Sequence, residues 1–481
     1  MQMTFNERGD AALTEGNLES AEQAFAESLR LNPRDSHAID GLGRVCRQRR
    51  AYALAVELFQ KAIELDPHQE VSQINLAHSL NELGRFDETL ASLERLPFNA
   101  SGNPEYLLIR GNALRALGRY QESLDAYSSG LKLSKAHNVA FLVNKANVLI
   151  DQKMFDQAEA ALNEASSREP KNKKILFNTA LLRLRLGDWR EGWSLHENRP
   201  QMFSNAVFMS KSALSIRERS SDGNGLKKTL LTFEQGLGDT IQFIRFANHQ
   251  RFKNTELTLH VPSPLRRLVE CSFPSCRVTD QKAVLSEHFD QTSSLLSVPA
   301  NLNFNAETDV HSSPYLRVSP VVLGEIRNSL RIEKERLNIG IQWRGSDNPR
   351  LQNRSIPLSI FEQIIPEGAV VFSLRKEVTP SEKSWLKSQA IIDVSPAMSD
   401  LFDTAAIIEN LDVVLTCDTS VAHLAGALGK RVVLLLPYSS AWVWMEVRSD
   451  SPWYPSMTLV RQRFPGDWQS CVSTIRRQLV F

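Results

Sequence analysis

A glycine-rich turn beside a carboxylate follows the first strand-like run in the C-terminal half of the chain. Residues 229–233 (TLLTF) have the pattern of a short buried strand, and residues 234–240 (EQGLGDT) come directly after it. The two glycines, Gly236 and Gly238, allow the backbone to turn tightly and to approach a ligand closely. Asp239 then stands at the start of a helix, where it could act as a general base or could satisfy free N–H groups of that helix as a cap. The turn lacks the Lys-Ser/Thr pair of a P-loop and the third glycine of a dinucleotide-binding turn.

A second group of polar residues lies at the end of a later strand. Residues 412–416 (DVVLT) have the pattern of a buried strand, and Asp418, Thr419 and Ser420 then begin a helix built of small residues. The two hydroxyls and the free N–H groups of the helix could bind an anion, for which a diphosphate is the natural occupant. Asp418 would repel a phosphate but could accept hydrogen bonds from sugar or ribose hydroxyls. His423 could face the same ligand, or it could simply pack between helix and sheet.

Arginines follow another strand of this region. Residues 337–343 (LNIGIQW) are followed by Arg344, and the same loop contains Arg350 and Arg354. Arginines in a loop after a strand could bind phosphate oxygens. The alternative is that they are solvated loop charges.

The strands that would position these residues alternate with helix-like segments over about residues 229–481. They are short continuous apolar runs, which indicate parallel sheets covered on both faces. Six runs have this pattern: 229–233, 258–262, 337–343, 369–374, 412–416 and 431–437. The region is long enough for two doubly wound domains, in which ligands bind at the carboxyl ends of strands. The sequence therefore places the chemistry in this half.

A 34-residue period occupies the N-terminal part of the chain. Phe25 recurs as Phe59, and Gly84 recurs as Gly118. A fixed period of this length predicts helical hairpins stacked into a solenoid with a concave groove. Four asparagines recur in the first helices of the later repeats: Asn75, Asn112, Asn147 and Asn178. They could clamp the backbone of an extended peptide, or they could hydrogen-bond neighbouring turns of the solenoid.

The period ends near Trp189 and Trp193, which lie four residues apart on one helical face. We expect these rings to cover the end of the solenoid against the next domain. The following residues, 199–228, are rich in serine and turn-forming residues, so we interpret them as a linking segment.

Composition narrows the possible partners. The chain has 481 residues and a formal net charge of +1, which gives no global electrostatic reason to expect nucleic acid or an anionic membrane as a partner. The five cysteines are scattered, so a zinc site is not expected. No signal peptide and no run of 18 apolar residues occur, so we expect a soluble protein of the cytoplasm without a membrane span.

Two resemblances sharpen these expectations. Residues 1–198 resemble the tetratricopeptide repeat in their pattern of small residues, Ala, Phe and Pro. Residues 228–465 resemble the heptosyltransferase-like (family 9) glycosyltransferases, through the Gly-Leu-Gly-Asp turn at 236–239 and the segment Asp-Thr-Ser-Val-Ala-His-Leu-Ala at 418–425. That family has the GT-B architecture, in which two Rossmann-like domains face a cleft.

The second resemblance implies roles for single residues. The acidic residue after the glycine-rich turn, here Asp239, is the expected base that deprotonates an acceptor hydroxyl, and Gly238 beside it is expected to contact the donor. The later segment contacts the diphosphate of a nucleotide sugar, through Asp418, Thr419, Ser420 and His423. The basic residue that handles the leaving phosphate has two candidates, Arg344 and Arg354. With arginines and a helix N-terminus supplying positive charge, neither a metal nor another cofactor is expected.

The combined expectation is an all-α tetratricopeptide solenoid followed by an α/β GT-B half. The predicted domains are the solenoid (1–198), the linking segment (199–228), an acceptor-side Rossmann-like domain (229–330) and a donor-binding Rossmann-like domain (331–481). The organisation is similar to that of protein O-glycosyltransferases, which implies a nucleotide-sugar donor and a protein or peptide acceptor held by the repeats. A homo-oligomer is possible. A non-catalytic interaction scaffold and a glycan- or lipopolysaccharide-directed transferase are the alternatives.

Overall fold

The computed structural model describes residues 3–96, 102–133, 138–200, 226–309, 314–333, 335–346 and 353–478. The chain divides into two compact units, one formed by residues up to Ile175 and the other by residues from Leu176 onwards. Most of the expected linking segment, together with Arg350, lies outside the described residues.

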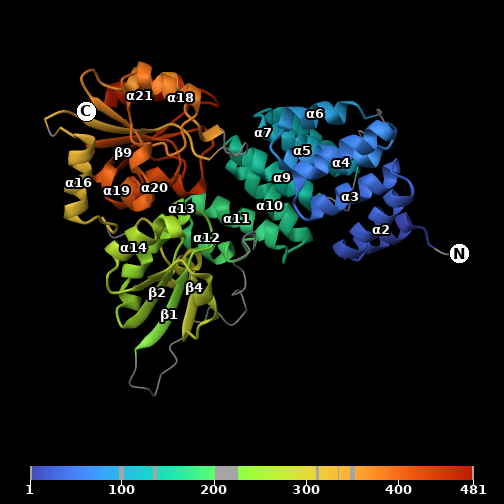
Figure 1. Cartoon of the computed structure of the whole chain (residues 1–481), viewed down its shortest axis with the longest axis horizontal. Coiled ribbons are helices and arrows are strands. Elements are labelled where there is room, and N and C mark those ends of the chain that lie inside the picture. The colour runs from blue at the N-terminus through green and yellow to red at the C-terminus, as the bar shows by residue number, and fades with distance from the viewer. Residues whose placement is uncertain are drawn as a thin grey trace. The chain divides into compact units, whose positions relative to one another are not determined.

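The described part of the first unit is built of α-helices, each packed against its neighbours in sequence (Figure 1). The helices are α1 (Phe5–Thr14), α2 (Leu18–Leu31), α3 (Ser36–Gln48), α4 (Tyr52–Leu65), α5 (Glu70–Glu82), α6 (Phe86–Glu94), α7 (Pro104–Ala116), α8 (Tyr120–Leu133), α9 (Asn138–Asp151) and α10 (Phe155–Arg168). Two further helices, α11 (Lys173–Arg185) and α12 (Trp189–His196), complete the series. The all-α solenoid predicted from the period is confirmed.

Each hairpin turns through a residue in the left-handed region of backbone space. The position recurs along the chain as Gly16, Arg50, Gly84, Gly118, Lys153 and Gly187, with φ between 60° and 86°. Glycine adopts this conformation without steric cost, whereas a residue with a Cβ is strained there. The recurring glycine of the sequence period is therefore a turn residue. In two repeats, Arg50 and Lys153 take its place.

Other glycines make room for aromatic rings between helices. A Cβ at Gly9 or at Gly41 would lie 2.5 Å from the ring of Phe25, and a Cβ at Gly43 would lie 2.6 Å from the ring of Phe59. Both rings are fully buried. The recurring glycines thus leave space for the recurring phenylalanine rings, which allows the helices to pack closely.

The second unit contains two parallel sheets. The first has the strand order β3-β2-β1-β4 and the second has the order β10-β9-β8-β5-β6-β7. The first sheet comprises β1 (Lys227–Thr232), β2 (Thr255–His260), β3 (Arg277–Thr279) and β4 (Gln291–Ser294). The second comprises β5 (Asn338–Gln342), β6 (Val370–Ser373), β7 (Ile392–Asp393), β8 (Val413–Thr416), β9 (Arg431–Leu436) and β10 (Met457–Arg461). All six strands predicted from the sequence are present, while β3, β4, β7 and β10 were not predicted.

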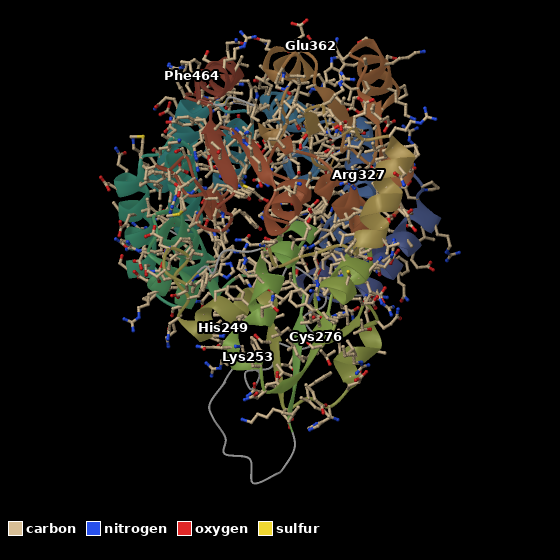
Figure 2. The ribbon with its side chains drawn as sticks, turned by 90° about the vertical axis from the view of Figure 1, so that its left-hand side faces the viewer. His249, Lys253, Cys276, Arg327, Glu362 and Phe464 are labelled. Carbon is tan, nitrogen blue, oxygen red and sulfur yellow. The ribbon has the colours of Figure 1, made fainter. Side chains whose placement is uncertain are left out.

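Helices connect and cover these strands. They are α13 (Leu237–Phe243), α14 (Arg266–Ser272), α15 (Val298–Leu302), α16 (Pro320–Leu330), α17 (Leu358–Ile364), α18 (Pro380–Ser388), α19 (Leu401–Glu409), α20 (Ser420–Ala427) and α21 (Trp468–Gln478). One continuous hydrophobic core contains buried residues of both sheets and of α12. In Figure 2, Glu362 and Phe464 mark the end of this unit that carries the second sheet, and His249 and Lys253 mark the end that carries the first.

The last helical hairpin, α11–α12, packs within the second unit. Trp189 and Trp193 are buried and meet the ring of Trp453 at 5.8 and 6.3 Å in edge-to-face geometry. The ring centre of Trp193 also lies 6.0 Å from that of Phe243, the last residue of α13. The expectation that these two tryptophans pack against the next domain is confirmed. Among the helices of the described ranges, none combines the length and the apolar character needed to cross a membrane.

Candidate functional site

The two sequence motifs of the C-terminal half meet in space, because helices α13 and α20 pack against each other. A Cβ placed on Gly238 would lie 3.0 Å from Cδ2 and 3.5 Å from Nε2 of His423. Each helix begins at the carboxyl end of a strand, α13 after β1 and α20 after β8. Figure 1 shows both helices between the two sheets.

The first motif follows the strand at which the order of its sheet reverses, and the second motif follows a neighbour of the corresponding strand. In the first sheet, β2 and β4 flank β1, and in the second, β6 and β8 flank β5. The carboxyl ends of strands at such a reversal form the usual ligand crevice of open α/β sheets. The turn after β1 and the segment after β8 are therefore the places at which this topology favours ligand binding.

Asp239 lies in the first turn of α13, whose N-cap is Gly236. The N–H groups of Gly236 and of Asp239 itself lie near this carboxyl and favour its ionised form. Its surroundings nevertheless raise its pKa to about 6, chiefly through desolvation and secondarily through the negative charge of Asp418, with Arg354 opposing the shift. A carboxylate with a pKa near neutrality, still in partial contact with solvent, is suited to accept a proton.

Thr419 is the N-cap of α20, but its side chain makes no capping hydrogen bond. Its Oγ1 is buried and has no hydrogen-bond partner. Ser420 is the first residue of the helix and is partly exposed. An N-cap hydroxyl usually satisfies the N–H of the second or third helical residue, and here that bond is missing. The N-terminus of α20 therefore has an unused hydroxyl beside the first N–H groups of the helix, which lack an i−4 carbonyl partner.

Asp418 precedes this helix and is buried. Arg354 lies beside it, with Nη1 3.2 Å from Oδ2 of Asp418 and about a third of its side chain exposed. The structure thus brings Asp239, Asp418 and Arg354 close enough for their charges to act on one another. The arrangement combines two carboxylates with a partly exposed cation.

Arg344, at the end of β5, is held differently. Its guanidinium pairs with Glu382, at 2.6 Å from Nε to Oε1 and 3.1 Å from Nη2 to Oε2. Glu382 also accepts the indole N–H of Trp343 at 2.6 Å and closes the capping box of α18 with Thr379. After the cost of desolvation, these donors lower the pKa of Glu382 to about 2. Of the two arginines proposed from sequence, Arg354 is the one that the structure places beside Asp418.

His423 is buried, and its Nδ1 lies 2.9 Å from the hydroxyl of Tyr454. Its ring stacks on Trp444 at 4.9 Å. Burial lowers its pKa to about 4, so the imidazole is neutral at physiological pH. The ring is therefore packed among Trp444, Tyr454 and Gly238 of the other motif.

Some residues around the site were not singled out from the sequence. Arg245 lies 4.6 Å from the ring centre of Tyr315 and 4.9 Å from that of Tyr454, and it donates to the carbonyl of Trp453 at 2.8 Å. Arg199 binds Glu234 in the turn that follows β1. Glu234 stands within the EQGLGDT segment, but nothing in the sequence paired it with an arginine at the end of the last helical hairpin.

The repeat asparagines differ from one another. Oδ1 of Asn112 accepts hydrogen bonds from the hydroxyl of Tyr127 at 2.7 Å and from Nδ2 of Asn144 at 3.2 Å. Asn112 therefore bonds within the solenoid, as the alternative interpretation expected. Asn75 is buried with an unpartnered Nδ2, while Asn147 and Asn178 are partly buried.

Two family models of the tetratricopeptide repeat match the N-terminal region, one over residues 6–70 and 143–191 and the other over residues 46–112. The N-terminal region carries tetratricopeptide repeats. By sequence the repeats extend into α12, although α11–α12 pack in the second unit.

Similar proteins cover different shares of the chain. Protein FlbA of Caulobacter vibrioides is 25% identical over 96% of this chain and 82% of its own length. The Hsp70-Hsp90 organising protein of Plasmodium falciparum is 28% identical over 30% of this chain and 57% of its own length. A solved structure, YrrB, described as a TPR protein with an unusual peptide-binding site, is 19% identical, with 36% of this chain and 90% of that chain covered and a TM-score of 0.32. The FlbA similarity thus spans both units.

Proposed function

We propose that the second unit is a glycosyltransferase that moves a sugar from a nucleotide-sugar donor to a hydroxyl group. The observation that carries the proposal is the meeting of α13 and α20, which sets a carboxyl of pKa about 6 beside a helix N-terminus with an unused hydroxyl. Sugar transfer to a hydroxyl needs both functions: a base for the acceptor proton and positive charge for the leaving phosphate.

Asp239 is the base in this proposal. Desolvation keeps its carboxyl weakly acidic, so the ionised form takes up a proton readily as the acceptor oxygen attacks the anomeric carbon. As the new bond forms, the bond from that carbon to the donor's diphosphate breaks, and the diphosphate leaves with the electron pair.

The N-terminus of α20 and Arg354 are the proposed donor site. The free N–H groups, the Thr419 and Ser420 hydroxyls and the guanidinium stabilise the negative charge that develops on the departing diphosphate. Asp418 accepts hydrogen bonds from sugar or ribose hydroxyls, and Arg354 offsets its repulsion of the phosphates.

The acceptor is proposed to be a protein or peptide segment held by the repeats. Tetratricopeptide arrays bind partners along their concave surface, and the chain is also similar to the Hsp70-Hsp90 organising protein over 30% of its length. Asn147 is the best candidate for a backbone clamp, because its side chain is partly exposed and makes no hydrogen bond within the described residues.

The test is a screen of nucleotide sugars and nucleoside diphosphates for thermal stabilisation of the full chain. A ligand at 100 times its dissociation constant should stabilise the fold by about 2.7 kcal/mol. With the donor found, transfer to hydroxyl acceptors is measured for the wild type and for Asp239→Asn, which should bind the donor and fail to transfer. If no nucleotide stabilises the chain, the scaffold alternative is favoured.

Two threonines supply a matched pair of variants for the donor site. Thr379 caps α18 with a fully engaged hydroxyl, whereas the hydroxyl of Thr419 at α20 has no partner. Thr419→Val should therefore leave the unliganded fold intact and reduce the nucleotide-induced shift. Thr379→Val should lower stability and leave that shift unchanged. The opposite pattern would contradict the proposed donor site.

A further inference from the structure

Arg199 follows α12 and extends into the turn that carries the glycine-rich motif. Its Nε and Nη2 bind the two carboxylate oxygens of Glu234 at 2.7 and 2.6 Å. Nη2 also donates to Oγ of Ser297 at 2.7 Å, and Nη1 donates to Glu197 at 2.7 Å and to the carbonyl of His196 at 3.4 Å. All five N–H groups of the guanidinium are therefore used, and only 1% of the side chain is exposed.

Both carboxylate oxygens of Glu234 accept hydrogen bonds. Besides Arg199, it accepts a hydrogen bond from Oγ of Ser294 at 2.5 Å. Glu234 follows β1 and Ser294 ends β4, so this contact joins the carboxyl ends of the two strands at which the first sheet reverses its order. The side chain of Glu234 thus ties these two strand ends together at the start of the glycine-rich turn.

The turn between Glu234 and Asp239 needs such support. It contains two glycines, which restrict the backbone less than any other residue. At its far end, Gly238 is held against the ring of His423. At its near end, Glu234 is held by Arg199, and the saturated guanidinium has no donor left for a substrate.

We infer that Arg199 is a positioning residue: with Glu234, Ser294 and Ser297 it forms a clamp, the Arg199 clamp, that fixes the glycine-rich turn and thereby sets the place of Asp239. The catalytic consequence rests on the proposed role of Asp239, but the clamp itself does not. The last helical hairpin thus supplies part of the catalytic unit, in addition to continuing the repeats.

The experiment measures amide hydrogen exchange by mass spectrometry on the full chain. Arg199→Met should raise exchange in a peptide covering residues 230–243 on the order of ten-fold, and leave residues 418–428 at the wild-type rate. Arg185→Met is the matched control. This buried arginine of the same hairpin binds Glu446 and, at 2.6 Å, the carbonyl of Ser440, so its loss should loosen residues 438–446 instead.

Two milder variants cover the case in which Arg199→Met fails to fold. Arg199→Lys keeps the charge but cannot form the paired bonds to Glu234, and Ser294→Ala removes one donor to Glu234 together with the acceptor of the Leu296 N–H. Both should raise exchange in residues 230–243 by smaller factors. Unchanged exchange there in folded variants, or an equal rise throughout the second unit, would overturn the inference.

A kinetic measurement separates this inference from the proposed function. If the chain transfers a sugar, Arg199→Lys should lower kcat and leave the donor KM unchanged, because the clamp does not touch the donor site. If no nucleotide binds the wild type, the proposed function fails while the exchange pattern still reports the clamp. A changed donor KM with unchanged kcat would count against positioning.

Discussion

Gly238 and His423 fit together so closely that a Cβ at position 238 would lie 3.0 Å from Cδ2 of the imidazole. The ring has little freedom to retreat, because it stacks on Trp444 and is bound to the hydroxyl of Tyr454. The second glycine of the turn is therefore required by the partner motif on the other sheet, and its backbone φ is not in the left-handed region.

Gly238→Ala should lower the free energy of unfolding by about 1–3 kcal/mol, the usual cost of overpacking a buried contact. Gly236→Ala is the control, since its Cβ would meet only Oδ2 of Asp239 at 3.7 Å, an ordinary contact. Urea denaturation of both variants measures the difference. Equal losses would mean that the contact with His423 is not what excludes a side chain at 238.

Asp239→Asn should make stability less dependent on pH. The folded-state pKa of Asp239 is raised from 3.8 to about 6, so between these values the unfolded state ionises first and stability is lost as pH rises. The asparagine variant escapes this loss. It should be more stable than the wild type at pH 8 by as much as ~3 kcal/mol, and should differ little at pH 4.

Glu382→Gln should change the pH dependence of stability in the opposite direction. Its carboxyl has a pKa lowered to about 2, so its contribution is present above about pH 4.5 and falls as pH decreases through the folded value. That variant should lose stability at pH 8, and the loss should shrink at pH 3. Urea denaturation at these pH values tests both residues, and a gain from Asp239→Asn that is the same at pH 4 and pH 8 would argue against the raised pKa.

Asn112→Ala should destabilise the repeats. The substitution leaves the buried hydroxyl of Tyr127 and the amide of Asn144 without their shared acceptor, at a cost of about 1–3 kcal/mol. Asn147→Ala, at a partly exposed side chain without a hydrogen bond in the described residues, should stay within about 0.5 kcal/mol of the wild type. Thermal unfolding compares them. A stable Asn112→Ala variant would reopen its role as a peptide clamp.

Most of the helices and strands could be predicted from the sequence. The six continuous apolar runs became parallel strands, and the period became stacked helices, because strand and helix patterns are local in the chain. Strands β3 and β7 have only three and two residues, too few for a pattern to show.

The long-range pairings could not be predicted. Arg199 and Glu234 lie 35 residues apart in the chain, and Arg354 could be assigned to Asp418 only once the sheet had been formed. In the sequence, Arg344 and Arg354 are equivalent candidates, because each follows the same strand. Glu382, which engages one of them, comes from a helix later in the chain.

The repeat period continues to about residue 191, whereas the second compact unit already begins at Leu176. Two truncations should show whether α11–α12 belong to the fold of the second unit. Removing residues 1–172 keeps α11–α12 and should leave the second unit folded, since that unit begins at Leu176. Removing residues 1–200 deletes two buried tryptophans, each worth about 3–5 kcal/mol, and strips the partly buried Glu234 of its arginine at a further cost. The combined loss reaches the whole stability of a typical domain, about 5–15 kcal/mol. Near-UV circular dichroism and urea denaturation should therefore show a cooperative transition only for the longer fragment, and a cooperatively folded shorter fragment would place α11–α12 with the repeats after all.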